Sequence, residues 1–154
     1  MARSIQLAQG LDKYEGRPDD PRGWTNVLAD VPLFAALNAR HLRKVAAAAR
    51  IRRFRDSTEL MRAGEPGNDV HVVLDGEVAI RRPGRSSLTL GIGSFVGELA
   101  LLDGGVRTAT VVARGPVITL AISRARFRKL LLAEPPIAVA IAEELARRLR
   151  SGKD

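Results

Sequence analysis

The chain contains no cysteine, and this absence removes several classes of protein at once. Without thiols there is no disulfide framework, no thiolate metal site and no thiol redox chemistry. The sequence also lacks a hydrophobic run long enough to span a bilayer, and its start has no apolar core of the kind that signal peptides carry. We therefore expect a protein of the cytoplasm that does not enter a membrane.

Histidine is almost as scarce, with His41 and His71 as the only two. Neither has a second histidine or a spaced set of carboxylates near it, which metal sites and acid–base sites need. The sequence also lacks a G-x-S-x-G nucleophile motif and a Walker phosphate loop. Its closest approach to a dinucleotide fingerprint is the spacing of Gly91, Gly93 and Gly97, which lie in a region without a βαβ pattern. We expect no enzyme activity, no catalytic residues and no metal ligands.

Basic side chains outnumber acidic ones, with 25 Lys and Arg against 17 Asp and Glu and a formal net charge of +8. This excess indicates either an anionic partner such as nucleic acid or a solvated, Arg-rich surface. The densest run, residues 50–55 (RIRRFR), has Phe54 as its only aromatic. Because the arginines are scattered along the whole chain, the charge alone does not identify a function.

The first part of the chain reads as a polar arm followed by helices. Residues 1–23 are rich in Gly, Pro and Asp, so we expect an arm there and one folded domain over residues 24–154. Asn38 is a predicted N-cap for the stronger of two short helices. Apolar residues recur at helical spacing in both segments, at Trp24, Val27, Leu28 and Val31 and at Leu42, Val45, Ala46 and Ala49.

From residue 51 to residue 122, short apolar runs alternate with turn signals. Asp75-Gly76 is a strong hairpin signal, and we expect it to join strands at 70–74 and 78–80. Residues 114–116 (RGP) are expected to separate two further strands, at 106–112 and 117–122. Strands of this length and spacing predict a mainly β body, closed or sandwich-like, with helices on both sides of it in the sequence.

Helical periodicity returns after residue 122. Ser123 is a predicted N-cap for a helix that Pro135-Pro136 ends. A last helix follows, and its apolar face is expected to pack on the rest of the molecule. That face consists of Ile137, Ile141, Leu145 and Leu149.

Residues 95–111 (FVGELALLDGGVRTATV) carry the most specific chemistry in the chain. A short helical turn over residues 98–102 would leave its first amides free for a phosphate, and Gly97 lets the backbone approach a ligand closely. Arg107 can bind phosphate oxygens through charge-assisted hydrogen bonds, while Glu98 is suited to accept hydrogen bonds from a sugar hydroxyl. The alternative is that Glu98 and Arg107 form an ordinary surface ion pair.

This stretch resembles the phosphate-binding cassette of cyclic-nucleotide-binding domains, F-I/V-G-E-L/M-A/G-L followed by R-S/T/A-A-x-V. The similarity extends over roughly Val31 to Arg150 and includes residues 64–78 (GEPGNDVHVVLDGEV), which resemble the central glycine-containing motif of the family. Within the family, the sequence is more similar to the catabolite-activator branch than to the kinase regulatory branch. It departs from the common pattern at Ser57, where many members have a turn glycine.

The resemblance implies a jelly-roll β-barrel with N-terminal helices and two C-terminal helices, and a ligand, cAMP or alternatively cGMP, rather than a cofactor. Glu98 matches the acceptor for the ribose 2′-hydroxyl and Arg107 matches the phosphate clamp. A threonine at position 108 can bond a guanine amino group, although members with a hydroxyl there also bind cAMP. The implied binding residues are Phe95, Val96, Gly97, Glu98, Leu99, Ala100, Arg107, Thr108 and Ala109.

The resemblance also implies an output, a bacterial receptor whose C-terminal helices shift on ligand binding and change the surface offered to a protein partner. Arg147, Arg148 and Ser151 lie where the base-capping group of the family arrives, or else the last helix closes the barrel and its charges are solvated. Because no helix-turn-helix module follows, sequence-specific DNA binding is not expected, and the oligomeric state stays open. The competing interpretations are a nucleotide-independent scaffold of the same fold and a basic nucleic-acid-binding protein.

Overall fold

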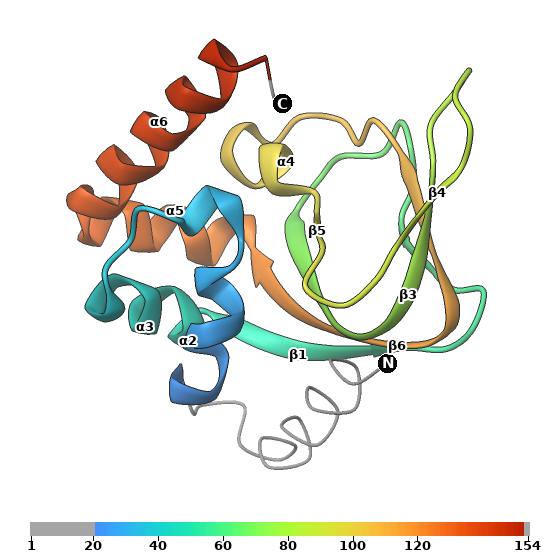
Figure 1. Ribbon diagram of the computed structural model, residues 1–154, viewed down its shortest axis with the longest axis horizontal. Helices are drawn as coiled ribbons and strands as arrows, with labels where there is room; N and C mark the ends of the chain where they lie inside the picture. Colours follow the sequence, from blue (N-terminus) through green and yellow to red (C-terminus); the bar gives the residue numbers. More distant parts are fainter. Residues whose placement is uncertain (1–20, 153–154) are drawn as a thin grey trace.

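The computed structural model describes residues 21–152, with the side chains of residues 21–23, 98–100 and 148 left out. Figure 1 shows the helices gathered on one side of a strongly curved β body. The first helix within the described residues, α2 (Pro21–Ala29), contains Trp24, the residue at which the folded domain was predicted to begin. Most of the predicted arm, residues 1–20, lies outside the described residues.

Two short helical elements follow α2, namely η1 (Pro32–Phe34) and α3 (Ala39–Ala47). The predicted cap of α3 is confirmed, because the Asn38 side chain accepts a hydrogen bond from the backbone N–H of His41 at 2.9 Å. Such a cap satisfies one of the amides that a helix start leaves without a partner. Leu42, Val45 and Ala46 of α3 are buried as predicted, so this helix packs on the body, whereas Ala49, predicted on the same helical face, lies in β1.

The β body is one antiparallel sheet that curves around its own interior (Figure 1). Along its main path the strand order is β1-β6-β3-β4, while β2 pairs with β6 and β5 pairs with β3. The predicted mainly β fold with flanking helices is confirmed. The strands are β1 (Ala49–Phe54), β2 (Glu59–Met61), β3 (Asp69–Arg81), β4 (Leu88–Leu90), β5 (Phe95–Val96) and β6 (Thr110–Ser123).

The hairpin predicted at Asp75-Gly76 is wrong, and so is the break predicted at residues 114–116. Both β3 and β6 run through these positions and pair with each other, with register shifts where the two turn signals meet. Gly76 has a φ of +85°, and a Cβ atom there would lie 2.3 Å from the carbonyl oxygen of Pro116. Proline cannot donate to the ladder, so the two signals together produce a bulge that bends both long strands instead of ending them.

Ser57, in the turn between β1 and β2, has a φ of +65°. This value lies in the left-handed region, which glycine adopts at a lower energetic cost than other residues do. The backbone therefore keeps the shape of the turn that many family members build with glycine. The N–H of Ser57 donates to the carbonyl of Ala113 at 2.9 Å, which ties the turn to β6.

The chain ends in two helices, α5 (Arg124–Ala133) and α6 (Pro135–Arg150). The predicted cap is confirmed, since the Ser123 side chain accepts from the N–H of Arg126 at 3.2 Å. On α6, Ile137 and Ile141 are buried, but Leu149 is 71% exposed. The predicted four-residue apolar face is therefore wrong at its last member, because the final turns of α6 stand clear of the strands (Figure 1).

The core has two parts. One lies between the helices and the sheet and includes Trp24, Phe34 and Phe127, the last two with ring centroids 6.0 Å apart. The other fills the inside of the curved sheet and includes Met61 and Val96. Within the described residues, every helix is too short or too polar to traverse a bilayer.

Candidate functional site

A cavity of about 230 Å³ opens inside the curved sheet, between the end of β5 and the start of β6. It brings together the two parts of the predicted cassette that α4 (Glu98–Asp103) separates in the sequence. Its volume is below the roughly 300–1,000 Å³ of drug-sized sites, so it suits a small ligand. The lining residues are Met61, Ile80, Arg82, Leu88, Phe95, Val96, Gly97, Arg107, Thr108, Ala109 and Val111.

Several lining residues were not predicted from the sequence, and strand register explains why. Ile80 on β3 pairs with Leu88 on β4 and with Val111 on β6. Residues that are opposite each other in neighbouring strands share a face, so these three side chains meet in the cavity. The alternation along each strand indicates that one face is buried, but not which strands lie side by side.

Gly97 is required where it stands for two separate reasons. Its φ is +89°, which side-chain-bearing residues rarely adopt. In addition, a Cβ atom there would lie 2.3 Å from Nη1 of Arg107 and 2.9 Å from the carbonyl oxygen of Asp69. The missing side chain therefore lets the Arg107 guanidinium lie directly against the backbone where α4 begins.

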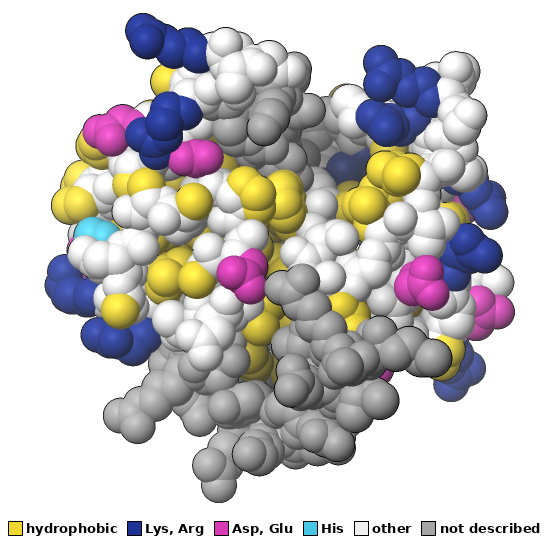
Figure 2. Space-filling view, viewed as in Figure 1, with side chains coloured by type: hydrophobic (Ala, Val, Ile, Leu, Met, Phe, Trp, Pro, Cys, Tyr) yellow, Lys and Arg dark blue, Asp and Glu magenta, His cyan; other side chains and the backbone are white. Residues whose placement is uncertain are grey.

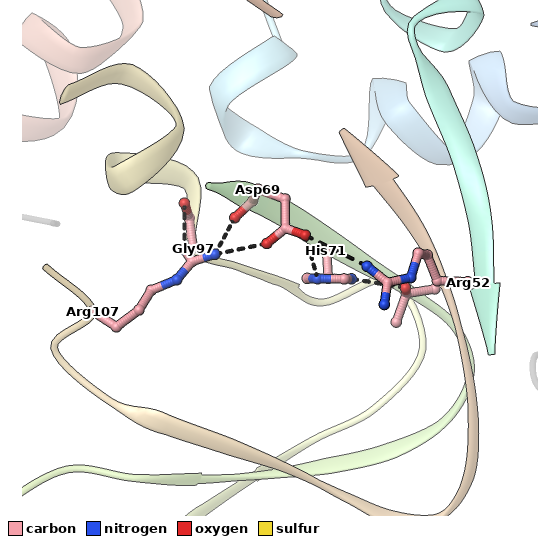
Figure 3. A network of polar contacts seen from close by, with 6 residues as sticks. Arg52, Asp69, His71, Gly97 and Arg107 are labelled. Carbon is pink, nitrogen blue, oxygen red and sulfur yellow. Dashed lines mark hydrogen bonds and ion pairs between the residues drawn. The ribbon is translucent and has the colours of Figure 1, made fainter. Parts of the chain in front are cut away.

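Arg107 is almost buried, at 7% exposure, and is held in place from two sides. Figure 3 shows its side chain reaching toward Gly97 and Asp69. Nη2 donates to the backbone carbonyl of Asp69 and, at 2.8 Å, to Oδ1 of its carboxylate, while Nη1 donates to the Gly97 carbonyl at 3.4 Å. Among the described residues nothing accepts from Nε–H or from the second Nη1–H.

The carboxylate beside Arg107 belongs to Asp69, which the sequence did not single out. Its other oxygen, Oδ2, lies 3.3 Å from Nε2 of His71 and 3.8 Å from Nη1 of Arg52. The His71 ring is fully buried and its Nδ1 lies 2.9 Å from the Thr119 hydroxyl. His71 is therefore a packing residue within a polar network (Figure 3).

Asp69 and Arg107 both have shifted pKa values. Burial acts to raise the pKa of Asp69, but the hydrogen bond and charge of His71, followed by the charges of Arg107 and Arg52, outweigh it and lower that pKa. Burial lowers the pKa of Arg107, opposed by Asp69. A guanidinium nevertheless keeps its charge at neutral pH. The cavity thus contains a fixed positive charge surrounded mostly by apolar side chains, which favours an anion.

Glu98, Leu99 and Ala100 begin α4, but their side chains lie outside the described part of the structure. Their predicted roles, including the choice between a sugar contact and an ion pair for Glu98, therefore remain predictions. The remaining cassette residues, Phe95, Val96, Gly97, Arg107, Thr108 and Ala109, all line the cavity.

Two of the three predicted base-capping residues, Arg147 and Ser151, do not line the cavity in this structure. Arg147 donates to Glu144 on its own helix at 2.8 Å, and its side chain is 55% exposed. Neither Arg147 nor Ser151 is among the described residues that line the cavity, and the Arg148 side chain lies outside the description. Capping of the base by the end of α6 would require this helix to move from the position it has here, and it stays a prediction.

A larger hollow of about 650 Å³ lies on the opposite face of β3. Both acidic and basic side chains line it, among them Asp56, Glu77 and Arg114. Asp56 already accepts from the N–H of Gly115 at 2.7 Å, and Arg114 donates to Thr89 at 2.9 Å. Because its carboxylates oppose an anion, and because Asp56 and Arg114 already have partners, the smaller cavity is the better candidate site.

Comparison with known proteins identifies the family to which the chain belongs. The model of the cyclic nucleotide-binding domain matches residues 51–134. The chain belongs to this family. It is 36% identical over 132 residues to a cyclic nucleotide-gated potassium channel of Mesorhizobium japonicum, covering 86% of this chain and 36% of the channel. The chain spans only 36–39% of the length of the curated channels that it matches.

Two solved structures extend the comparison. The N-terminal domain of a transcriptional regulator from Streptomyces coelicolor A3(2) superposes with a TM-score of 0.73 at 34% identity, covering 82% of this chain and 94% of that one. The regulatory domain of Toxoplasma gondii protein kinase A, solved with cAMP, gives 0.67 at 25% identity and covers 85% and 50%. The predicted β-barrel of this family, with its flanking helices, is confirmed.

Proposed function

We propose that the protein is a non-catalytic receptor for a cyclic purine nucleotide, cAMP or cGMP, which binds in the 230 Å³ cavity. The observation that carries this proposal is the state of Arg107. It is buried, charged and held by Asp69 and Gly97, and within the described residues its Nε–H and second Nη1–H have no partner and face a largely apolar space. Such a group binds the single negative charge of a cyclic phosphate with a strong, charge-assisted contact. The relative from Toxoplasma gondii was solved with cAMP, which supports the same class of ligand.

In this proposal the remaining cassette residues contact different parts of the ligand. Gly97, Leu99 and Ala100 contribute backbone around the phosphate, and Glu98 accepts from the ribose 2′-hydroxyl. Thr108 and Ala109 lie beside the phosphate and the base. The base packs on apolar side chains of the cavity wall, from Phe95, Val96, Ile80 and Leu88.

The output of the receptor is a shift of α5 and α6 that changes the surface offered to a protein partner. In this proposal the folded unit corresponds to residues 24–154. With ligand bound, the end of α6, carrying Arg147, Arg148 and Ser151, docks over the base. Neither sequence-specific DNA binding nor a catalytic step is part of the proposal.

The test is calorimetry of the chain with cAMP and with cGMP. Arg107→Ala should weaken binding by roughly 2–4 kcal/mol, the cost of removing one partner of a desolvated charge pair. Arg107→Lys should also bind poorly, because an ammonium lacks the planar fork. Arg128→Ala, which removes an exposed arginine of α5, is the matched control and should bind like the parent. Circular dichroism of each variant separates loss of binding from loss of folding.

A second arm tests the sugar contact. A 2′-deoxy cyclic nucleotide should bind the parent more weakly than its ribo counterpart, and in Glu98→Gln this difference should shrink because an amide is a weaker acceptor than a carboxylate. A parent protein that binds neither nucleotide, or an Arg107→Ala variant that binds as tightly as the parent, would overturn the proposal and leave a nucleotide-independent scaffold.

A further inference from the structure

A second guanidinium, that of Arg82, lines the same cavity from the other end of β3. Ile80 faces the cavity, and Arg82 is two positions farther along the extended chain, so strand alternation turns it to the same face. Gly97, in contrast, follows β5, which pairs with His71 and Val72 near the start of β3. Arg82 and the Arg107–Gly97 pair therefore line the cavity beside opposite ends of β3, a strand that Figure 1 shows to be strongly curved.

The guanidinium of Arg82 is available for a ligand. Within the described residues it takes part in no hydrogen bond or ion pair, and only its backbone carbonyl is engaged, accepting from the N–H of Arg85 at 3.1 Å. The described lining of the cavity contains no carboxylate that would compete for it. Figure 2 shows Lys and Arg side chains (dark blue) gathered with hydrophobic ones at the tip of the β3–β4 hairpin, beside the hollow next to α4.

The two arginines differ in what they are prepared to bind. Arg107 is buried and fixed by Asp69, so it suits the phosphate that lies at Gly97. Arg82 is exposed and lies next to apolar Leu88, at the end of the cavity left for the base. A guanidinium there selects between purines by the hydrogen-bonding groups on the base edge.

Guanine matches this arrangement and adenine does not. Guanine presents two acceptors, O6 and N7, which an arginine fork binds together, whereas adenine presents N7 beside an amino donor that opposes the second N–H. The Thr108 hydroxyl, which also lines the cavity, can accept from the 2-amino group that guanine has and adenine lacks.

We propose that Arg82 reads the base and makes cGMP the preferred ligand of the cavity. This inference rests on the proposed function and names the ligand within it. It also reverses the order, cAMP before cGMP, that the cassette motif by itself suggested. Its two polar contacts act on different atoms of the base, so analogues can separate them.

The experiment is calorimetry of the full chain with cGMP, cAMP and cyclic inosine monophosphate, which keeps O6 and N7 but lacks the 2-amino group. The parent should bind cGMP at least about tenfold more tightly than cAMP. Arg82→Ala should weaken cGMP and the inosine nucleotide by about tenfold each and cAMP by a clearly smaller factor. Thr108→Val should cost cGMP more than it costs the inosine nucleotide.

Arg85→Ala is the matched control, because Arg85 is an exposed arginine of the same turn that does not line the cavity. It should leave the cGMP-to-cAMP ratio at the parent value. An Arg82→Ala variant that loses the same factor for both nucleotides would place Arg82 on the phosphate, and an unchanged variant would leave it solvated. Either result overturns this inference while nucleotide binding itself upholds the proposed function. A parent that binds no cyclic nucleotide overturns both.

Discussion

Asp69 decides how Arg107 is presented to a ligand. Its carboxylate and its backbone carbonyl together take both N–H groups of Nη2, which orients the guanidinium and leaves Nε–H directed elsewhere. The same carboxylate also contacts His71 and Arg52, so this one acidic side chain interacts with three basic side chains. Its position between these groups makes Asp69 a positioning residue for the site and a stabilising residue for the fold.

Replacing Asp69 tests this role. Asp69→Ala leaves Arg107 buried without its counter-charge, and we expect the free energy of unfolding to fall by about 2–4 kcal/mol, somewhat below the range for a fully buried pair because Asp69 keeps 23% of its side chain exposed. Asp69→Asn, which retains an acceptor oxygen, should cost less. Chemical denaturation measures both values.

The matched control is Asp30→Ala, which removes an exposed aspartate and should change stability by no more than about 0.5 kcal/mol. Equal losses for Asp69→Ala and Asp30→Ala would show that the Asp69–Arg107 pair adds nothing to the fold. A large loss confined to Asp69→Ala, together with weaker nucleotide binding by Asp69→Asn, is the expected pattern.

At the scale of elements, the end of α4 touches the start of α5. Gly104 has a φ of +67°, and a Cβ atom there would lie 2.8 Å from Cζ of Arg124. The Arg124 backbone N–H donates to the carbonyl of Asn68, directly before β3. A rearrangement of α4 therefore acts directly on the first residue of α5, which gives the proposed relay a physical contact.

The helix α6 is where that relay should be observed. In the proposal its end is mobile without ligand and docks over the base when nucleotide binds. Adding nucleotide should slow amide exchange in residues 137–146, and deleting residues 147–154 should lower affinity and remove this protection. Exchange in β1, which pairs with β6 along its whole length, serves as the internal control. Unchanged affinity with flat exchange along α6 would leave α4 and its flanking loops as the only moving part.

At the scale of the whole molecule, two carboxylates link stability to pH. The pKa of Glu134 is lowered by a hydrogen bond from Lys44 and by nearby positive charges, which joins the start of α6 to α3. The pKa of Asp69 is lowered despite burial, by His71, Arg107 and Arg52. Both groups bind protons less readily in the folded than in the unfolded chain, so each contributes stability at neutral pH.

This linkage predicts acid sensitivity with a definite sign. The stability from Glu134 and Asp69 is fully present above their ordinary pKa values of 4.5 and 3.8 and is lost as the pH falls below them, because the unfolded chain then binds protons first. Urea denaturation at stepped pH should show this loss below about pH 4.5. The loss should be shallower in Asp69→Asn, and an identical profile for parent and variant would contradict the assignment.

Local features of the fold were readable from the sequence because they depend on residues close together in the chain. Asn38 and Ser123 cap helices that begin within the next few residues, and a side-chain oxygen needs no distant partner to do so. Gly97 and Arg107 belonged to a motif whose spacing is itself the signal. The β character of the body followed from short apolar runs separated by turn signals, both of which are local features of the chain.

What only the tertiary structure decided depends on which strands lie side by side. Asp75-Gly76 has the composition of a hairpin turn, yet pairing with β6 carries β3 through it as a bulge. Asp69 and Arg107 are far apart in the chain and meet because β3 begins beside the loop that precedes β6. Arg82 lines the cavity because it lies two positions after Ile80, on the same face of the extended chain. Strand register and curvature are long-range properties. The periodicity of side chains shows which residues of one strand share a face, but it does not show which other strand pairs with it.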